Sequence, residues 1–159
     1  MIIYQDTQEK KGLDFELYEG VYITRQKLPE GDYMLEGNND IVIERKASTG
    51  EIYMNLSNTY EKGRFYRELE RLQKYKSPIL LFEFPESRLY DFPKYSGIPS
   101  SKHSKLRMTA QFLRKMVYEL PEKFPPLKVV FCSNRVEAQD FILKTFKDAQ
   151  NGHEKKFDF

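Results

Sequence analysis

The stretch that decides the fold is residues 31–46, which reads GDYMLEGNNDIVIERK. Its apolar residues fall in two short runs, at 33–35 and at 41–43, and the second run is rich in β-branched side chains. Between the runs, residues 37–40 read GNND and tolerate the positive φ values of a tight turn. We therefore predict a β-hairpin over this stretch.

The charged residues of this hairpin indicate a metal site. Alternation along the second strand puts Glu44 and Lys46 on one face and Arg45 on the other. Strand pairing can bring Asp32 close to Glu44, although the two are far apart along the hairpin. Two carboxylates beside an ammonium group are costly unless a hard cation joins them, and Mg²⁺ prefers carboxylate oxygens and keeps several waters. Lys46 could then orient or deprotonate a water molecule.

These motifs resemble a known family. Gly-Asp-Tyr at 31–33, followed by Ile-Glu-Arg-Lys at 43–46, is similar to the nuclease domain of the XPF and Mus-type structure-selective endonucleases. The pattern also fits the wider PD-(D/E)XK group, in which an acid precedes Glu-X-Lys. A lone Glu-X-Lys is a weak signal in a lysine-rich chain, but the two motifs at this spacing are a strong one.

The resemblance implies an α/β fold: a restriction-endonuclease-like three-layer sandwich, with a mixed central sheet flanked by helices. The order of elements predicts the same class, because strands and a hairpin come first and helix–strand–helix–strand–helix follows. We expect one nuclease domain over residues 1–150 and a polar C-terminal tail over 151–159.

The family also implies a set of metal ligands. Asp32 and Glu44 are expected to hold Mg²⁺ or Mn²⁺, with Asp6 and Glu9 as outer or second-metal ligands. The last two follow the opening strand in an Asp-X-Arg-Glu pattern, from which this chain departs by carrying Gln8. On the residues alone, 6–9 could equally be a polar loop after a strand.

The expected catalytic residues are Asp32, Glu44, Lys46 and Arg45. Lys46 would position the attacking water or stabilise charge on the phosphate, and the Arg45 carbonyl would complete the metal site. The Arg45 side chain would bind a phosphate oxygen.

Further DNA contacts are expected from basic residues: Arg45, Arg64, Arg67, Lys102 and Lys105. The family places a Gly-Arg-Phe/Leu run like 63–65 beside the active site. Lys102 and Lys105 lie in an irregular stretch whose basic tip could touch DNA. Two alternatives stay open: an Arg64–Glu68 helix pair, and an ordinary solvated helix face.

Periodicity predicts the remaining elements. Strands are expected at 2–4, 21–28, 79–84 and 127–132, and helices at 49–56, 60–75, 106–120 (ended by Pro121) and 136–146. Residues 85–104 are expected to form an irregular loop.

Composition excludes several classes of protein. The chain is 31% charged and 40% hydrophobic, which is typical of a globular domain. A single cysteine, Cys132, rules out an intramolecular disulfide and a cysteine-based zinc cluster. No run is apolar enough for a membrane helix or a signal peptide, so we expect an intracellular protein, cytoplasmic or, in a eukaryote, nuclear.

The sequence thus predicts a metal-dependent DNA endonuclease that hydrolyses phosphodiester bonds, in branched or otherwise structured DNA. The alternative is a catalytically inactive nuclease-fold subunit that binds DNA and partners an active nuclease. A homodimer is also expected, through the apolar helices at 106–120 and 136–146. One packed domain would use those faces as its own core.

Overall fold

The computed structural model describes residues 1–9, 11–13, 15 and 18–155. A sheet of six strands runs in the order β2-β1-β3-β4-β5-β6. The strands are β1 (Ile2–Gln5), β2 (Tyr22–Arg25), β3 (Tyr33–Leu35), β4 (Ile41–Lys46), β5 (Ser77–Phe82) and β6 (Lys128–Phe131). The helices are α1 (Thr49–Leu56), α2 (Thr59–Leu72), α3 (Ser87–Asp91), α4 (Ala110–Lys123) and α5 (Arg135–Lys155), with a 3₁₀ helix, η1, at Ser100–Lys105.

The sheet is mixed, as predicted. β3 is antiparallel to both β1 and β4. The parallel pairs are β1 with β2, β4 with β5, and β5 with β6. The predicted hairpin is β3–β4, in which Tyr33 pairs with Ile43. Its turn contains Gly37 at φ 79°, and Asn38 Oδ1 accepts hydrogen bonds from the N–H groups of Asp40 and Ile41.

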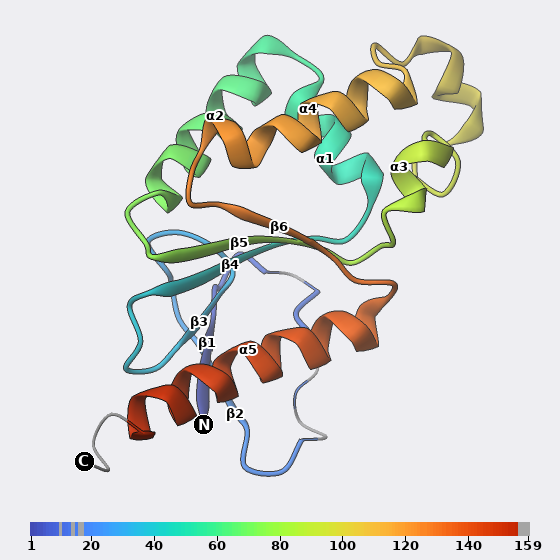
Figure 1. Cartoon of the computed structure of the whole chain (residues 1–159). Helices are drawn as coiled ribbons and strands as arrows, with labels where there is room; N and C mark the ends of the chain where they lie inside the picture. The colour runs from blue at the N-terminus through green and yellow to red at the C-terminus, as the bar shows by residue number, and fades with distance from the viewer. Residues whose placement is uncertain (10, 14, 16–17, 156–159) are drawn as a thin grey trace.

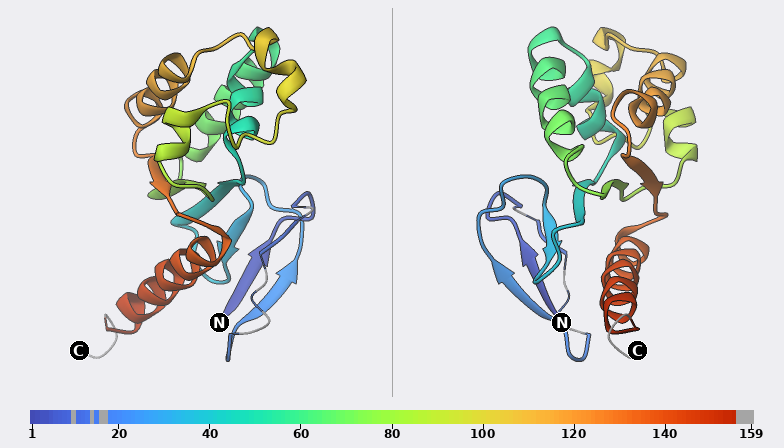
Figure 2. Two further views of the ribbon diagram at one scale, coloured as in Figure 1. Left: turned by 90° about the vertical axis from the view of Figure 1, so that its right-hand side faces the viewer. Right: turned by 60° about the vertical axis from the view of Figure 1, so that its left-hand side comes forward.

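The elements form three layers. Helices α1 to α4 cover one face of the sheet and α5 crosses the other face (Figures 1 and 2). Each interface has its own hydrophobic core: Phe65, Leu69, Val117 and Leu120 are buried in the first, and Ile142 in the second. The three-layer α/β sandwich is therefore confirmed.

Local hydrogen bonds fix the start of α1, which directly follows β4. Ser48 Oγ accepts from Glu51 N–H at 3.2 Å, and the Glu51 carboxylate accepts from Ala47 N–H at 2.7 Å. This is a variant of the capping box, in which Glu51 accepts from the residue before the N-cap Ser48. These hydrogen bonds set the direction in which the chain leaves β4. Residues of α1 therefore form one wall of the cavity described below.

Three expectations about element boundaries are wrong. Pro121 lies inside α4, because only its own N–H is missing and Phe124 N–H still reaches the Leu120 carbonyl at 2.9 Å. Helix α5 continues to Lys155, past the expected helix end at residue 146. The stretch 85–104 is not irregular throughout, since it contains α3 and most of η1. None of the helices in the described ranges is long and apolar enough to cross a membrane.

The apolar residues that suggested a dimer face are used within the chain. Leu113 and Val117 of α4 belong to the first core, and Ile142 and Phe146 of α5 belong to the second. These faces therefore cover the sheet of their own chain, which is the alternative that the sequence left open.

The loop that follows α3 packs closely against Gly50, at the start of α1. A Cβ atom placed on Gly50 would lie 2.3 Å from the Ser96 carbonyl oxygen, a contact too short to exist. A Cβ on Gly63, in the middle of α2, would meet only the end of the flexible Arg67 side chain, at 3.4 Å.

We predict opposite effects for alanine at these two glycines. Gly50→Ala should lower the free energy of unfolding by about 1–3 kcal/mol, because the Ser96 backbone must move. Gly63→Ala should raise it by roughly 0.5–1 kcal/mol, because alanine restricts the unfolded chain at no steric cost. Urea denaturation of both variants measures the difference. Equal effects would contradict the close approach of the loop to α1.

Candidate active site

Glu44 and Lys46 lie together on one face of β4, at its carboxyl end. The distance from Lys46 Nζ to Glu44 Oε1 is 3.6 Å. The Lys46 ammonium group also lies 5.1 Å from the centre of the Phe65 ring, on α2. The lysine is therefore held between a carboxylate and an aromatic face.

Asp32 joins this pair through the hairpin. Its N–H donates to the Ile43 carbonyl at 2.8 Å, and its Oδ2 accepts from Arg45 N–H at 2.8 Å. Since N–H and C=O of one strand residue point to the same side, the Arg45 carbonyl also faces the Asp32 side of β4. The predicted proximity of Asp32 and Glu44 is thus a consequence of the hairpin register.

The carboxyl groups perturb one another. Burial, with added repulsion from Glu9 and Glu68, raises the pKa of Asp32 to about 7, although the Arg45 N–H and the Lys46 charge oppose this shift. Burial also raises the pKa of Glu44 well above its ordinary value, with added repulsion from Asp32 and Glu68 and a hydrogen bond to Glu68. Buried acids that repel each other are typical of functional sites. Sequence reasoning considered Glu68 only as a helix partner of Arg64 and missed its contact with Glu44.

The side chain of Arg45 corrects one prediction. Its Nε donates to Glu83 at 2.7 Å, and its Nη1 lies 3.2 Å from both Glu9 Oε1 and the Lys11 carbonyl oxygen. Only 5% of the side chain is exposed. This guanidinium is occupied in a buried network on the opposite face of β4, so it is not placed to bind a phosphate.

The two acids after β1 have different surroundings. Glu9 lies at the site, with Oε1 bound to Arg45 and with a buried Oε2 that has no hydrogen-bond partner among the described residues. Asp6 is buried, and both of its carboxylate oxygens accept backbone N–H groups, from Leu28 at 2.8 Å and from Gln8 at 3.0 Å. Asp6 therefore braces the connections around the site and does not face it.

A cavity of about 560 Å³ opens at this point. It is lined by predicted site residues and by residues of α1 and the loop before η1: Glu9, Asp32, Glu44, Arg45, Lys46, Ser48, Gly50, Glu51, Met54, Asn55, Ser96, Gly97 and Ile98. Residues 96–98 carry no recognisable motif, and only the folded chain brings them here.

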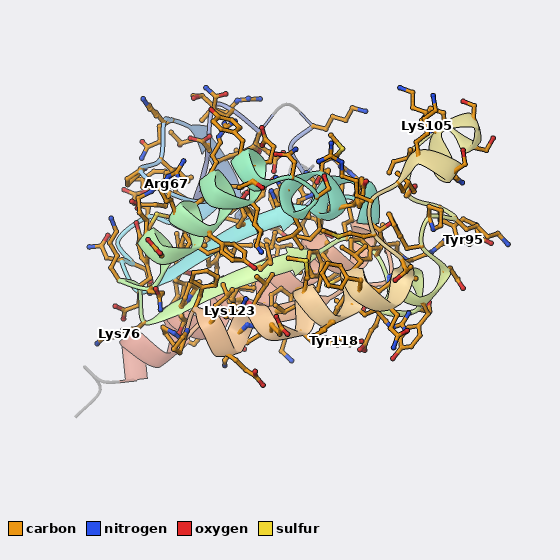
Figure 3. The ribbon with its side chains drawn as sticks, turned by 90° about the horizontal axis from the view of Figure 1, so that it is seen from above. Arg67, Lys76, Tyr95, Lys105, Tyr118 and Lys123 are labelled. Carbon is orange, nitrogen blue, oxygen red and sulfur yellow. The ribbon has the colours of Figure 1, made fainter. Side chains whose placement is uncertain are left out.

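The predicted DNA-contacting residues of α2 and η1 are exposed but lie outside this cavity. Arg64 and Arg67 are on α2, and Lys102 and Lys105 are on η1. Figure 3 shows Arg67 and Lys105 at opposite ends of the helical layer. The structure thus separates these residues into two groups, one on α2 and one on η1.

Two solved structures share this architecture. XPF from Aeropyrum pernix matches with a TM-score of 0.65 and 17% identity, and XPF from Aeropyrum pernix in complex with DNA matches with a TM-score of 0.64 and 18% identity. Each match covers 95% of this chain and 65% of that chain, so the present chain spans about two thirds of the XPF chains. At such identities the likeness establishes the fold.

Among curated proteins no relative matches the chain. A family comparison is decisive instead, because residues 5–145 match the ERCC4 domain, from the end of β1 into α5. This match takes in every residue of the candidate site. The chain belongs to the ERCC4 domain family.

Proposed function

We propose that this protein is a metal-dependent endonuclease that hydrolyses phosphodiester bonds in branched or otherwise structured DNA. The observation that carries the proposal is the joint position of Asp32, Glu44 and Lys46 in one cavity at the end of β4. The shared fold with XPF, one structure of which is a complex with DNA, supports it.

The chemistry of the site fits Mg²⁺ or Mn²⁺. The available donors are carboxylate oxygens, among them the buried and unpartnered Oε2 of Glu9. A divalent cation would offset the burial and the mutual repulsion that raise the pKa values of Asp32 and Glu44. Within the described ranges, no three His, Cys, Asp or Glu side chains form a metal cage by themselves. Mg²⁺ is commonly bound through one or two carboxylates, waters and substrate phosphates.

Each acid has a separate role in this proposal. Asp32, Glu44 and the Arg45 carbonyl hold the ion, and Glu9 supplies an outer or second-metal ligand. Asp6, whose backbone N–H donates to the Asp32 carbonyl at 2.8 Å, acts as a positioning residue. When bound, the cation supplies Lewis acidity towards the phosphodiester and lowers the pKa of water.

Lys46 supplies the part of the chemistry that does not depend on the cation. Its ammonium group, held by Glu44 and Phe65, faces the cavity in which a phosphodiester would lie. A fixed positive charge there orients the attacking water and stabilises negative charge that develops on the phosphate. Arg64, Arg67, Lys102 and Lys105 would bind the flanking DNA backbone. A homodimer remains a proposal, without a located interface.

A second candidate function is a DNA-binding subunit without catalysis. The observation that favours it is at Gly50, which lines the cavity at the start of α1 and adds no carboxylate to it. The Ser96 carbonyl occupies the space where a side chain at residue 50 would begin. Lys46 distinguishes the two candidate functions, because cleavage would require its charge whereas DNA binding alone would not.

We predict that Asp32→Asn stabilises the metal-free protein at neutral pH. The raised pKa means that the folded state binds more protons than the unfolded state between about pH 4 and 7, so stability falls as the pH rises through this range. The variant cannot titrate at this position. Its free energy of unfolding should exceed that of the wild type by up to about 4 kcal/mol at pH 8 and should equal it near pH 4. Thermal unfolding in EDTA across this range measures the gain, with Asp91→Asn as the exposed control. A pH-independent difference would contradict a titrating Asp32.

We predict that divalent cations bind through Asp32 and Glu44. Calorimetric titration with Mg²⁺ or Mn²⁺ should show binding that is lost in Asp32→Ala and in Glu44→Ala. Asp6→Asn keeps one of the two oxygen acceptors that the N–H groups of Leu28 and Gln8 use, and because Asp6 does not face the site this variant should retain the binding. Unchanged affinity in both alanine variants would remove the proposed ligands from the site.

We predict that Lys46→Met abolishes cleavage but leaves folding and DNA binding nearly intact. Methionine keeps an apolar stem beside Phe65 and removes only the charge. Loss of one such interaction typically lowers the rate on the order of 10²–10³-fold. Single-turnover cleavage and DNA affinity should be measured together, with Lys147→Met on α5 as the control. Wild-type cleavage by the Lys46 variant would show that the mechanism is wrong.

A further inference from the structure

A second cavity, of about 450 Å³, lies beside the candidate active site. It is formed by the segments that follow three parallel strands: residues 47–49 after β4, 83–85 after β5 and 133–135 after β6. Ser48 lines both cavities, so only the start of α1 separates them. Ligands of open α/β sheets commonly bind at the carboxyl ends of parallel strands.

The walls of the second cavity favour an anion. Arg88 and Arg135 contribute positive charge; the 41% exposed Arg135 side chain also donates to the carbonyls of Lys11 and Gly12. The single acid among the lining residues, Glu83, is engaged by the buried Arg45 at 2.7 Å and lies 4.0 Å from Arg135. Helices α1 and α5 begin at this cavity, and their N-termini add partial positive charge to it. Thr49, which is 1% exposed, also lines it, and its hydroxyl has no hydrogen-bond partner among the described residues.

An exposed aromatic ring stands at the rim of the same cavity. Tyr95 is 58% exposed, and the Arg88 guanidinium carbon lies 3.7 Å from the centre of its ring. The next residue, Ser96, packs on Gly50, so this ring stands between the second cavity and the candidate active site. Figure 3 shows Tyr95 projecting from the same end of the molecule as Lys105.

The surrounding surface carries an excess of basic over acidic residues. Residues 85–115 contain seven Lys or Arg and two Asp or Glu, whereas the net charge of the whole chain is only +2. A positive surface with exposed aromatic and guanidinium planes is typical of proteins that bind single-stranded nucleic acid. Bases within a duplex are stacked on one another, so only an unpaired base could lie against Tyr95.

We infer that the second cavity binds a nucleotide of a single-stranded DNA segment that adjoins the bond to be cut. Its phosphate lies between Arg88 and Arg135, and its base stacks on the plane formed by Arg88 and Tyr95. This inference rests on the proposed function and deepens it, because it selects substrates in which a single strand passes over Ser48. It accounts for the positive charge, the exposed ring and the position of the cavity together.

The test compares a labelled oligothymidylate with a blunt duplex, by fluorescence anisotropy in EDTA at several salt concentrations. Tyr95→Ala should weaken binding of the oligothymidylate by about 5- to 100-fold and leave duplex affinity unchanged. Arg88→Gln should reduce the slope of log affinity against log salt by about 0.7, the value for one phosphate contact on a single strand. Tyr22→Ala removes a ring that is 67% exposed on the far strand β2, and serves as the control.

The outcomes separate this inference from the proposed function. If the wild type binds neither DNA, both the proposed function and the subsite are wrong. If the wild type binds and both folded variants bind equally well, the subsite is wrong but the DNA-binding proposal stands. An equal loss for duplex and single strand, or a change in molecular mass of Tyr95→Ala by light scattering, would also overturn the subsite.

Discussion

The hydrogen bond from Arg45 N–H to the Asp32 carboxylate, at 2.8 Å, is the interaction on which the site depends. β4 continues to Lys46, whereas its ladder with β3 ends at the Asp32–Ile43 contact. Without Asp32, the Arg45 N–H at the end of this ladder would lack its acceptor. The aspartate side chain takes the place of the missing strand and is thereby fixed beside Glu44. The hydrogen bond that the Arg45 N–H needs therefore also places the carboxylate of Asp32 beside that of Glu44.

This arrangement costs stability, and the rest of the fold supports it. β4 is paired along its whole length with β5, whose residues Leu80, Leu81 and Phe82 are fully buried between the two cores. On one face of β4, Lys46 offsets part of the charge of Glu44, and on the other face Arg45 is bound by Glu9 and Glu83. Unfavourable groups persist at functional sites when the surrounding structure determines their positions. The raised pKa values of Asp32 and Glu44 are the sign of that cost.

Local pattern was enough to predict the hairpin, the face shared by Glu44 and Lys46, and the mixed sheet, because these follow from strand alternation and turn chemistry. The role of Arg45 could not be predicted, since it depends on Glu83 at the end of another strand and on Glu9 after a third. Asp6 was misplaced for a similar reason: its acceptors are satisfied by the N–H of Leu28, far along the chain. The loop at 96–98 entered the site through its contact with Gly50, which leaves no periodic signal.

The most direct measurement is incubation of the purified chain with end-labelled branched and linear DNAs in Mg²⁺, in Mn²⁺ or in EDTA. We expect internal cleavage of a branched substrate that requires a divalent cation and stops in EDTA, because the proposed role of Asp32 and Glu44 is to hold that cation. Binding of branched DNA without cleavage under any of these conditions would contradict a nuclease and favour the binding subunit. Cleavage that persists in EDTA would contradict the metal site.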